Sequence, residues 1–291
     1  MKVNLVSDLH LEFGYQELPG GEVLILSGDI AEARTILKAK QGYEADKAKV
    51  MDNHFYRGWE FFVDECSKYK RVFYVMGNHE HYHGRFDKTY HELKSVLPDN
   101  VIVLEKEHLE YNGVVFMGAT LWTDLNRGDP VTTYTVKNGM NDYRVITNYY
   151  VDKGLYHKLT PEHTFHEHKK TLAYFKKTLD ENVDKPFVIL THHAPSFQSV
   201  ADEFKYDKHM NGGYASELSE FILDHPQIKI WTFGHMHHRH RYYMGDTLLV
   251  ANPKGYCGHE SSAADFVVKT IDLDNMPAKN TVENDYNWRL F

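Results

Sequence analysis

Histidines, aspartates and one asparagine form short polar clusters along this chain. The clusters read Asp8-Leu9-His10, Gly28-Asp29, Gly77-Asn78-His79-Glu80, Thr191-His192-His193 and Gly234-His235-Met236-His237. Each follows an apolar run that is typical of a buried strand, and strand ends are where the sites of α/β proteins assemble. Residues i and i+2 of an extended segment point the same way, so we expect Asp8 and His10 to converge, and likewise His235 and His237.

The side chains of these clusters suit metal ions with oxygen and nitrogen ligands. Carboxylates, an amide and imidazoles, without a thiolate, favour Mn, Fe, Zn or Ni over Ca or Mg. The candidate ligands are Asp8, His10, Asp29, Asn78, His192, His235 and His237. They exceed what one ion normally takes from a protein, so we expect two divalent ions. We expect Asp29 to bridge them, because it stands alone in its cluster and paired ions in hydrolases lie about 3.5–4 Å apart.

A bridged pair of ions predicts a reaction class. Such a pair would hold a hydroxide at neutral pH, polarise phosphoryl oxygens, and place the nucleophile and the leaving group in line. The sequence therefore predicts hydrolysis of phosphoesters.

Short strands and a few helices must position these clusters. The apolar runs predict strands at residues 2–7, 22–27, 71–76, 101–103, 114–117, 187–190, 229–233, 248–250 and 266–271. Three- and four-residue spacings predict helices within 31–69 and at 85–97 and 165–179. The turn Asn112-Gly113 predicts that 101–103 and 114–117 pair as a hairpin. We expect a single domain over residues 1–291.

Residues 127–168 lack clear periodicity and are rich in tyrosine. We interpret them as a cap or lid inserted within the domain. Their tyrosines could stack on a nucleobase, although aromatic residues more often pack a cap onto its own domain.

The composition excludes several classes of protein. The chain carries 33 Lys and Arg against 41 Asp and Glu, a net charge of −8, which disfavours a general phosphate-backbone binder. No apolar run approaches the roughly 20 residues of a membrane span, and we see no leader peptide, so a soluble cytoplasmic protein is expected. Cys66 and Cys257 lie far apart and indicate neither a disulfide framework nor a thiolate zinc site. The 20 histidines direct attention to metals.

In this order, the five motifs resemble those of the calcineurin-like metallophosphoesterase superfamily. The segment Asn252-Pro253-Lys254-Gly255-Tyr256 also resembles one found in small prokaryotic and phage members. The resemblance implies an α/β fold, a four-layer α/β/β/α sandwich of two mixed sheets flanked by helices. It implies one metal ion on Asp8, His10, Asp29 and His237, and the other on Asp29, Asn78, His192 and His235. It implies that His79 contacts the substrate as general acid for the leaving alkoxide.

The expected catalytic residues are thus His79, Asp29 and Asn78, with Mn as the expected metal and Fe, Zn or Ni as alternatives. The expected substrate is a phosphomonoester or phosphodiester, a nucleotide or another small molecule. A protein Ser/Thr phosphatase is disfavoured, because Ile30-Ala31-Glu32 follows Gly28-Asp29 where those enzymes carry an arginine element. A metal-dependent nuclease and a non-catalytic scaffold remain as alternatives.

Several polar residues beside the motifs keep two interpretations. His193 could support a ligand or be structural, His81 and His83 could line a groove or belong to a loop, and His238 and His240 are expected at the surface. Either Arg85 or Arg144 could clamp a phosphate.

Overall fold

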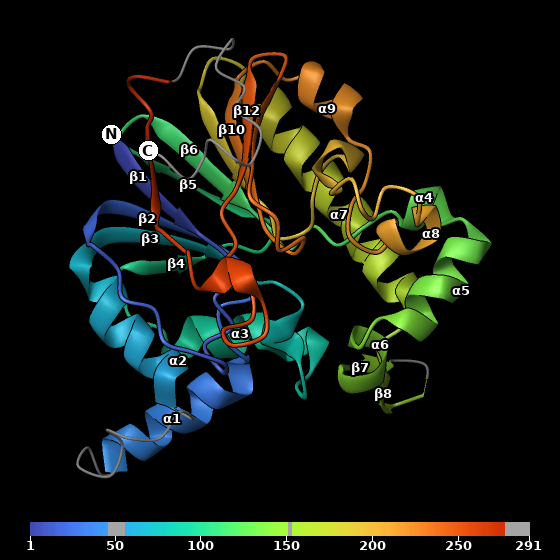
Figure 1. The fold of residues 1–291 in the computed structure, drawn as a ribbon, viewed down its shortest axis with the longest axis horizontal. Helices are drawn as coiled ribbons and strands as arrows, with labels where there is room; N and C mark the ends of the chain where they lie inside the picture. Colours follow the sequence, from blue (N-terminus) through green and yellow to red (C-terminus); the bar gives the residue numbers. More distant parts are fainter. Residues whose placement is uncertain (46–55, 151–152, 277–291) are drawn as a thin grey trace.

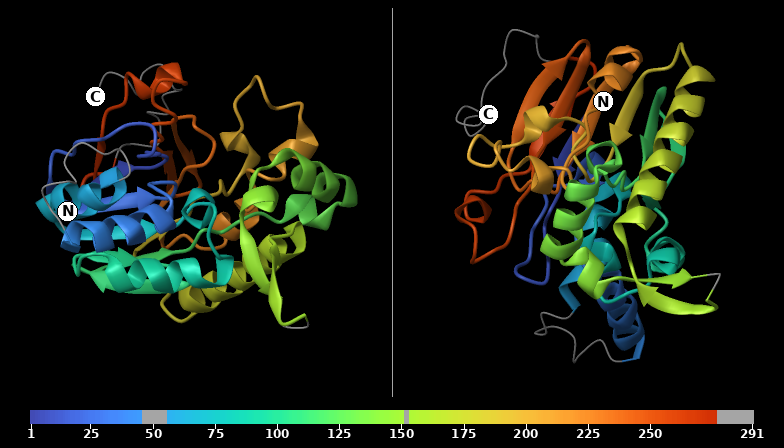
Figure 2. Two further views of the ribbon diagram at one scale, coloured as in Figure 1. Left: turned by 90° about the horizontal axis from the view of Figure 1, so that it is seen from below. Right: turned by 90° about the vertical axis from the view of Figure 1, so that its right-hand side faces the viewer.

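The computed structural model describes residues 1–45, 56–150 and 153–276 of the 291-residue chain. Two large β-sheets lie face to face, and helices cover their outer surfaces (Figures 1 and 2). Apolar side chains fill three layers: between the sheets, and between each sheet and its helices. This confirms the predicted α/β/β/α sandwich.

The first sheet has the strand order β13-β1-β2-β3-β4. Its strands are β1 (Lys2–Val6), β2 (Gly21–Ser27), β3 (Tyr69–Val75), β4 (Val101–Val103) and β13 (Lys269–Asp272). Strands β1 to β4 are parallel, and β13 pairs antiparallel with β1. The carboxyl ends of β1, β2 and β3 therefore meet at one edge, where Asp8, Asp29 and Asn78 follow them.

The second sheet has the order β11-β12-β10-β9-β6-β5. Its strands are β5 (Glu107–Tyr111), β6 (Val114–Gly118), β9 (Phe187–Leu190), β10 (Ile228–Phe233), β11 (His240–Met244) and β12 (Thr247–Ala251). Strands β6, β9, β10 and β12 are parallel, with β5 and β11 antiparallel at the two edges. His192 follows β9 and His235 follows β10.

Helices α1 (Ala33–Ala45), α2 (Arg57–Glu60) and α3 (Phe86–Val96) lie against the first sheet. Helices α7 (Pro161–Asp180) and α9 (Ser219–Leu223) lie against the second (Figure 1). In the described part of the chain, no helix is both long and apolar enough to cross a membrane.

Each sheet packs against the other sheet on one face and against helices on the other, and side chains along the central strands alternate between these two cores. In β2, Val23 and Ile25 belong to the core between the sheets, whereas Leu24 and Leu26 belong to the core beneath the helices. Because every position is buried on one side or the other, such strands are continuous apolar runs. This explains why the sequence marked them so clearly.

The predicted pairing of 101–103 with 114–117 is wrong. Strand β4 joins the first sheet, parallel to β3, and the Asn112-Gly113 turn connects β5 with β6 in the second sheet. Strand β5 reads Glu-His-Leu-Glu-Tyr and lies mostly exposed at a sheet edge, so it shows no apolar pattern that could identify it.

Within 31–69, where a helix was predicted, the described residues form α1 up to Ala45 and α2 from Arg57, and a π-helical turn over Phe61–Glu65 follows α2. Residues 46–55 of the prediction lie outside the described residues. Helix α7 begins four residues before the predicted start, at Pro161, because proline is well tolerated in the first turn of a helix.

A smaller group of elements lies beside the sandwich (Figure 1). It contains α4 (Leu125–Gly128), α5 (Pro130–Gly139), α6 (Asp142–Val145), the hairpin of β7 (Thr147–Tyr150) and β8 (Leu155–Lys158), and α8 (Lys208–Asn211). These elements share a small core of their own that includes Trp122, Val136 and Ile146. The interpretation of residues 127–168 as a cap stays a prediction.

Stacked aromatic rings from β3 and β6 pack the two sheets against each other. Phe73 of β3 and Phe116 of β6 are fully buried, with ring centroids 4.0 Å apart and planes 5° from parallel. We expect Phe116→Ala to lower the free energy of unfolding by about 3–5 kcal/mol, because it leaves a cavity between the sheets. Chemical denaturation measures this. The control Tyr134→Ala, at a side chain that is 72% exposed, should change the free energy by less than about 0.5 kcal/mol.

Candidate metal centre

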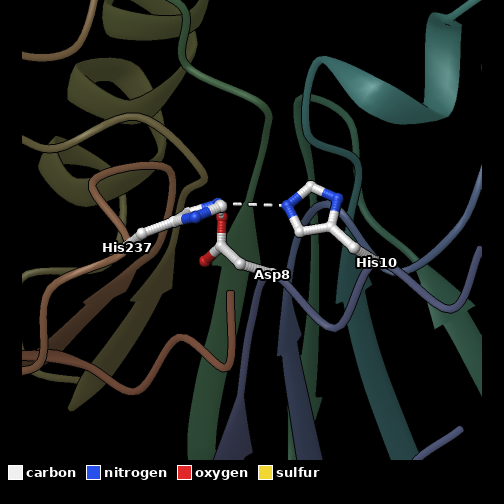
Figure 3. Close-up of side chains that lie close together, drawn as sticks. All are labelled: Asp8, His10 and His237. Atoms are coloured by element: carbon white, nitrogen blue, oxygen red, sulfur yellow. Dashed lines mark hydrogen bonds and ion pairs between the residues drawn. The ribbon is translucent and has the colours of Figure 1, made fainter. Parts of the chain in front are cut away.

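The seven predicted ligands come together between the facing strand ends. Those from the first sheet are Asp8, His10, Asp29 and Asn78, and those from the second are His192, His235 and His237. Six of the seven are buried, and His237 is 16% exposed. Figure 3 shows His10 and Asp8, which follow β1, facing His237, which follows β10.

One group of donor atoms surrounds the Nε2 atom of His237. This atom lies 3.0 Å from Nε2 of His10 and 3.5 Å from Oδ1 of Asp8 (Figure 3). Nε2 of His10 is also 3.7 Å from Oδ2 of Asp29.

A second group surrounds the Nε2 atom of His192. It lies 3.0 Å from Oδ1 of Asn78, 3.2 Å from Nδ1 of His235 and 3.4 Å from Oδ1 of Asp29. Asp29 therefore contributes one carboxylate oxygen to each group.

The chemistry of these donors fits metal ions. Nδ1 of His192 lies 2.9 Å from the Ser27 carbonyl oxygen and donates its proton there, so Nε2 is the nitrogen that a metal ion could bind. Nδ1 of His237 likewise faces the Glu260 carboxylate at 2.8 Å. In each group, nitrogen and oxygen atoms thus point at one another, and a cation between them, a proton or a metal ion, stabilises the arrangement. A histidine whose other nitrogen is held by a carbonyl or carboxylate is the usual metal-binding arrangement.

The electrostatics also demand positive charge at this place. Despite burial, the neighbouring histidines, His192 foremost, hold the pKa of Asp29 well below its usual range. Burial opposes protonation of His192 and His237 as well, yet Asp29 raises the pKa of His192 to about 9, and Asp8 with Glu260 raises that of His237 to about 10. The buried carboxylates therefore stay ionised and stabilise cations beside them, whether protons or divalent ions.

The backbone brings the ligands together differently from the prediction. Asp8 and His10 converge as expected, whereas His235 and His237 belong to different groups. The expected basis in extended strands is wrong, because five candidate ligands have left-handed backbones: Asp8 (φ 50°), His10 (42°), Asp29 (54°), His235 (65°) and His237 (50°). Such conformations cost about 1–3 kcal/mol each in residues other than glycine. Hydrogen bonds between the loops hold them, among them Asp8 N–H to the Gly28 carbonyl (3.0 Å) and His235 N–H to Oδ1 of Asp8 (2.9 Å).

Glu80 fixes the two loops that carry Asp29 and Asn78. Its buried carboxylate accepts hydrogen bonds from the backbone N–H groups of Asp29 (3.0 Å), Ile30 (2.7 Å) and Gly77 (2.6 Å). The Tyr74 hydroxyl donates a fourth at 2.6 Å. Glu80 belongs to the Gly77-Asn78-His79-Glu80 motif, but its role does not follow from the sequence. Only the folded chain brings these N–H and O–H groups to its carboxylate.

Two glycines leave room for the ligands. A Cβ atom at Gly28 would lie 2.3 Å from Nδ1 of His192, and one at Gly77 would lie 2.1 Å from Oδ1 of Asp29. Glycine is therefore required at both positions by close approach of side chains from other loops.

His79 stands beside the two donor groups. Its backbone N–H donates to Oδ1 of Asp29 at 2.9 Å, and its ring atom Nε2 lies 4.0 Å from Oδ2 of the same carboxylate. The ring stacks on Tyr82, with centroids 4.0 Å apart, and its Nε2 atom is 3.3 Å from the Tyr256 hydroxyl.

A cavity of about 1020 Å³ opens over the cluster and is lined by Asp29, Asn78, His79, His235 and His237. Other parts of its wall come from Tyr82, from residues 139–142, from the region of α8, from residues 236–239, and from the segment 256–262. Asp142, carried by α6, is buried in this wall, and burial raises the pKa of its carboxyl to about 6. No motif or spacing in the sequence marks Asp142.

The residues with two interpretations are now placed. His193 is buried, with Nδ1 3.2 Å from the Thr120 carbonyl oxygen, and packs against His235. Arg85 pairs with Glu92 at 2.7 Å, and Arg144 donates to the Asn138 carbonyl oxygen. Neither arginine lines the cavity, and neither do His81 and His83. Arg239 and His238 do line it. His240 is partly buried.

The fold and site together define a four-layer α/β/β/α protein with carboxylate and histidine clusters able to hold metal between its sheets. The family model of the calcineurin-like phosphoesterases matches residues 1–239, and the chain belongs to this family. The predicted resemblance is confirmed.

Two relatives illustrate the similarity. The "Uncharacterized protein L509" of Acanthamoeba polyphaga mimivirus is 25% identical over 297 residues, covering 94% of this chain and 98% of that protein. The crystal structure of the phosphopantetheinyl hydrolase PptH from Mycobacterium tuberculosis superposes with a TM-score of 0.62 at 14% identity, covering 95% of this chain and 98% of the other. The second likeness supports the fold.

The role of Glu80 can be tested by one substitution. In Glu80→Gln, an amide N–H group must face backbone N–H groups, so buried donors lose their acceptor, and we expect the free energy of unfolding to fall by about 1–3 kcal/mol. We also expect fewer metal ions per chain, measured by elemental analysis after dialysis against Mn²⁺. Glu181→Gln, at a side chain 61% exposed, is the control. Unchanged stability together with full metal content in Glu80→Gln would contradict this role.

Proposed function

We propose that the chain is a metal-dependent hydrolase of small phosphomonoesters or phosphodiesters. The observation that supports it most strongly is the convergence of seven residues with oxygen or nitrogen ligand atoms, among them Asp29, whose carboxylate both groups share, beside a cavity. Membership of the phosphoesterase family agrees with this reaction class.

The two donor groups suggest how metal would be held. Asp8, His10, Asp29 and His237 would bind one divalent ion, and Asp29, Asn78, His192 and His235 the other, with Mn as the favoured metal and Fe, Zn or Ni as alternatives. A pair of such ions would supply a hydroxide nucleophile at neutral pH and charge to stabilise the phosphoryl oxygens.

The chain's own residues complete the reaction. The Glu80 hydrogen bonds hold Asp29 in place, and Ser27 and Glu260 orient His192 and His237. His79 lines the cavity, and its Nε2 atom would give a proton to the departing alkoxide, so that the leaving group departs as a neutral alcohol.

The cavity wall favours small substrates over nucleic acids. Among the described residues that line it, Arg239 is the only arginine or lysine, whereas Asp142, Glu203, Asp207 and Glu260 are acidic. A polyanion that extends beyond the reacting phosphate would meet these carboxylates, and the net charge of −8 adds to the repulsion.

Hydrolysis of chromogenic esters tests the proposal without knowledge of the natural substrate. After chelation, we expect p-nitrophenyl phosphate or bis-p-nitrophenyl phosphate to be cleaved when Mn²⁺, Ni²⁺ or Zn²⁺ is restored singly, and Mg²⁺ to be less effective because the imidazole ligands suit softer ions. Absorbance of p-nitrophenolate measures the rate. Bound metal with no hydrolysis of either ester would contradict the function and favour a non-catalytic protein.

The proposed acid role of His79 predicts a loss of turnover with the metal site intact. We expect His79→Asn to lower kcat by about 10²- to 10⁴-fold, the usual contribution of a general acid, while the metal content stays at the wild-type value. Steady-state kinetics and elemental analysis measure both quantities. His83→Asn, four residues along the chain and 44% exposed, should retain wild-type kcat. Turnover near the wild-type rate in His79→Asn would remove His79 from this role.

A further inference from the structure

We propose that Tyr256 is a positioning residue for His79, whose imidazole it holds with Nε2 facing the cavity. The inference rests on the proposed function, in which His79 delivers a proton to the leaving group. It also gives a role to the segment Asn252-Pro253-Lys254-Gly255-Tyr256, which the metal site itself leaves unexplained.

This segment continues β12 and runs beside the loop that carries Asp8. The N–H of Ser7 donates to the Asn252 carbonyl (3.1 Å), and the N–H groups of Lys254 and Gly255 donate to the carbonyls of Ser7 (3.0 Å) and Asp8 (2.9 Å). The backbone before Tyr256 is therefore fixed to the backbone of the metal site.

Side chains of the segment also hold its backbone in place through hydrogen bonds. The Asn252 amide donates to the carbonyls of Leu5 (2.8 Å) and Val267 (3.1 Å), and the Lys254 ammonium donates to the Tyr15 carbonyl (2.8 Å). Gly255 has φ +82°, and a Cβ there would lie 2.2 Å from Oε2 of Glu260. Glycine thus turns the chain into the cavity and leaves space for the Glu260 carboxylate that orients His237.

Tyr256 reaches His79 from this anchored position. Its hydroxyl lies 3.3 Å from Nε2 of His79, and its ring packs against His10 and His237, with centroid distances of 4.4 and 4.8 Å. Tyr82 stacks on the His79 ring and sets its plane. The aromatic contacts fix where Tyr256 stands, and its hydroxyl fixes which ring edge of His79 faces the cavity.

The direction of the hydrogen bond follows from whether Nε2 carries a proton. The Tyr256 hydroxyl donates to Nε2 of His79 when that nitrogen carries none. The terminal torsion of a histidine is broad and roughly two-fold, so the ring would otherwise sample the reversed orientation. When His79 is protonated, the same oxygen can accept, and the ring keeps its orientation through the proton transfer.

The test removes only the hydroxyl group. In Tyr256→Phe, we expect kcat on p-nitrophenyl phosphate to fall about 3- to 10-fold, the size of one hydrogen bond, with KM within about twofold and full metal content. Tyr69→Phe is the matched control, because it removes a buried hydroxyl that accepts a bond from Asn4 at 2.8 Å and does not line the cavity. Its kcat should equal that of the wild type.

A double-mutant cycle distinguishes positioning from a general structural role. In the His79→Asn background, we expect Tyr256→Phe to change kcat by less than about twofold, because the residue through which it acts is gone. An equal loss in both backgrounds, or no loss in either, would overturn the proposal.

A second readout does not need activity. In ¹⁵N-histidine-labelled protein, the His79 ring signals, assigned by their loss in His79→Asn, should show the proton on Nδ1 in the wild type and a shift toward the other tautomer in Tyr256→Phe. If the tautomer shifts but the protein hydrolyses neither ester, the positioning role of Tyr256 is supported and the proposed function is contradicted. An unchanged tautomer would overturn the positioning role whatever the activity.

Discussion

The structure depends on one buried carboxylate, that of Asp29, held ionised between two groups of imidazoles. An isolated carboxylate in this position would take up a proton, because burial disfavours charge. Here His192 lies 3.4 Å from one oxygen of Asp29 and His10 lies 3.7 Å from the other. Positive charge on His192, whose pKa Asp29 raises to about 9, compensates for the burial of Asp29, and such a setting also suits divalent cations.

The face-to-face packing of the two sheets brings Asp29 and the imidazoles together. Parallel strands direct their carboxyl ends to one edge, and packing through Val23, Ile25 and the Phe73–Phe116 stack sets the two edges side by side. Neither sheet alone holds a complete donor group: Asp29 comes from one and His192 from the other. The stability of the core between the sheets is thereby coupled to the geometry of the site.

Strained backbone and loops with few alternatives make the site rigid. Five ligands occupy left-handed conformations, and the loops compensate with hydrogen bonds between them, many of which meet at Glu80. The segment that ends at Tyr256 extends this support to His79. In the proposed reaction, ligand positions held in this way would lower the cost of reaching the transition state. The cavity wall from α6 and the region of α8 belongs to another group of elements and is where substrate preference would be set.

The sequence by itself determined the strand ends and the candidate ligands that follow them, because fully covered strands are continuous apolar runs and polar clusters interrupt them visibly. The sandwich was implied by the resemblance of the five motifs to the calcineurin-like family. It failed at β5, whose exposed edge position needs no apolar pattern, and so the hairpin partner of β6 was assigned wrongly. The expected convergence of Asp8 with His10 was obtained from extended geometry, whereas left-handed turns produce it. Glu80, Asp142, Glu260 and the contact of Tyr256 with His79 were decided only by the tertiary structure. Their partners lie on other loops, and no local spacing encodes which distant backbone groups a carboxylate or hydroxyl will meet.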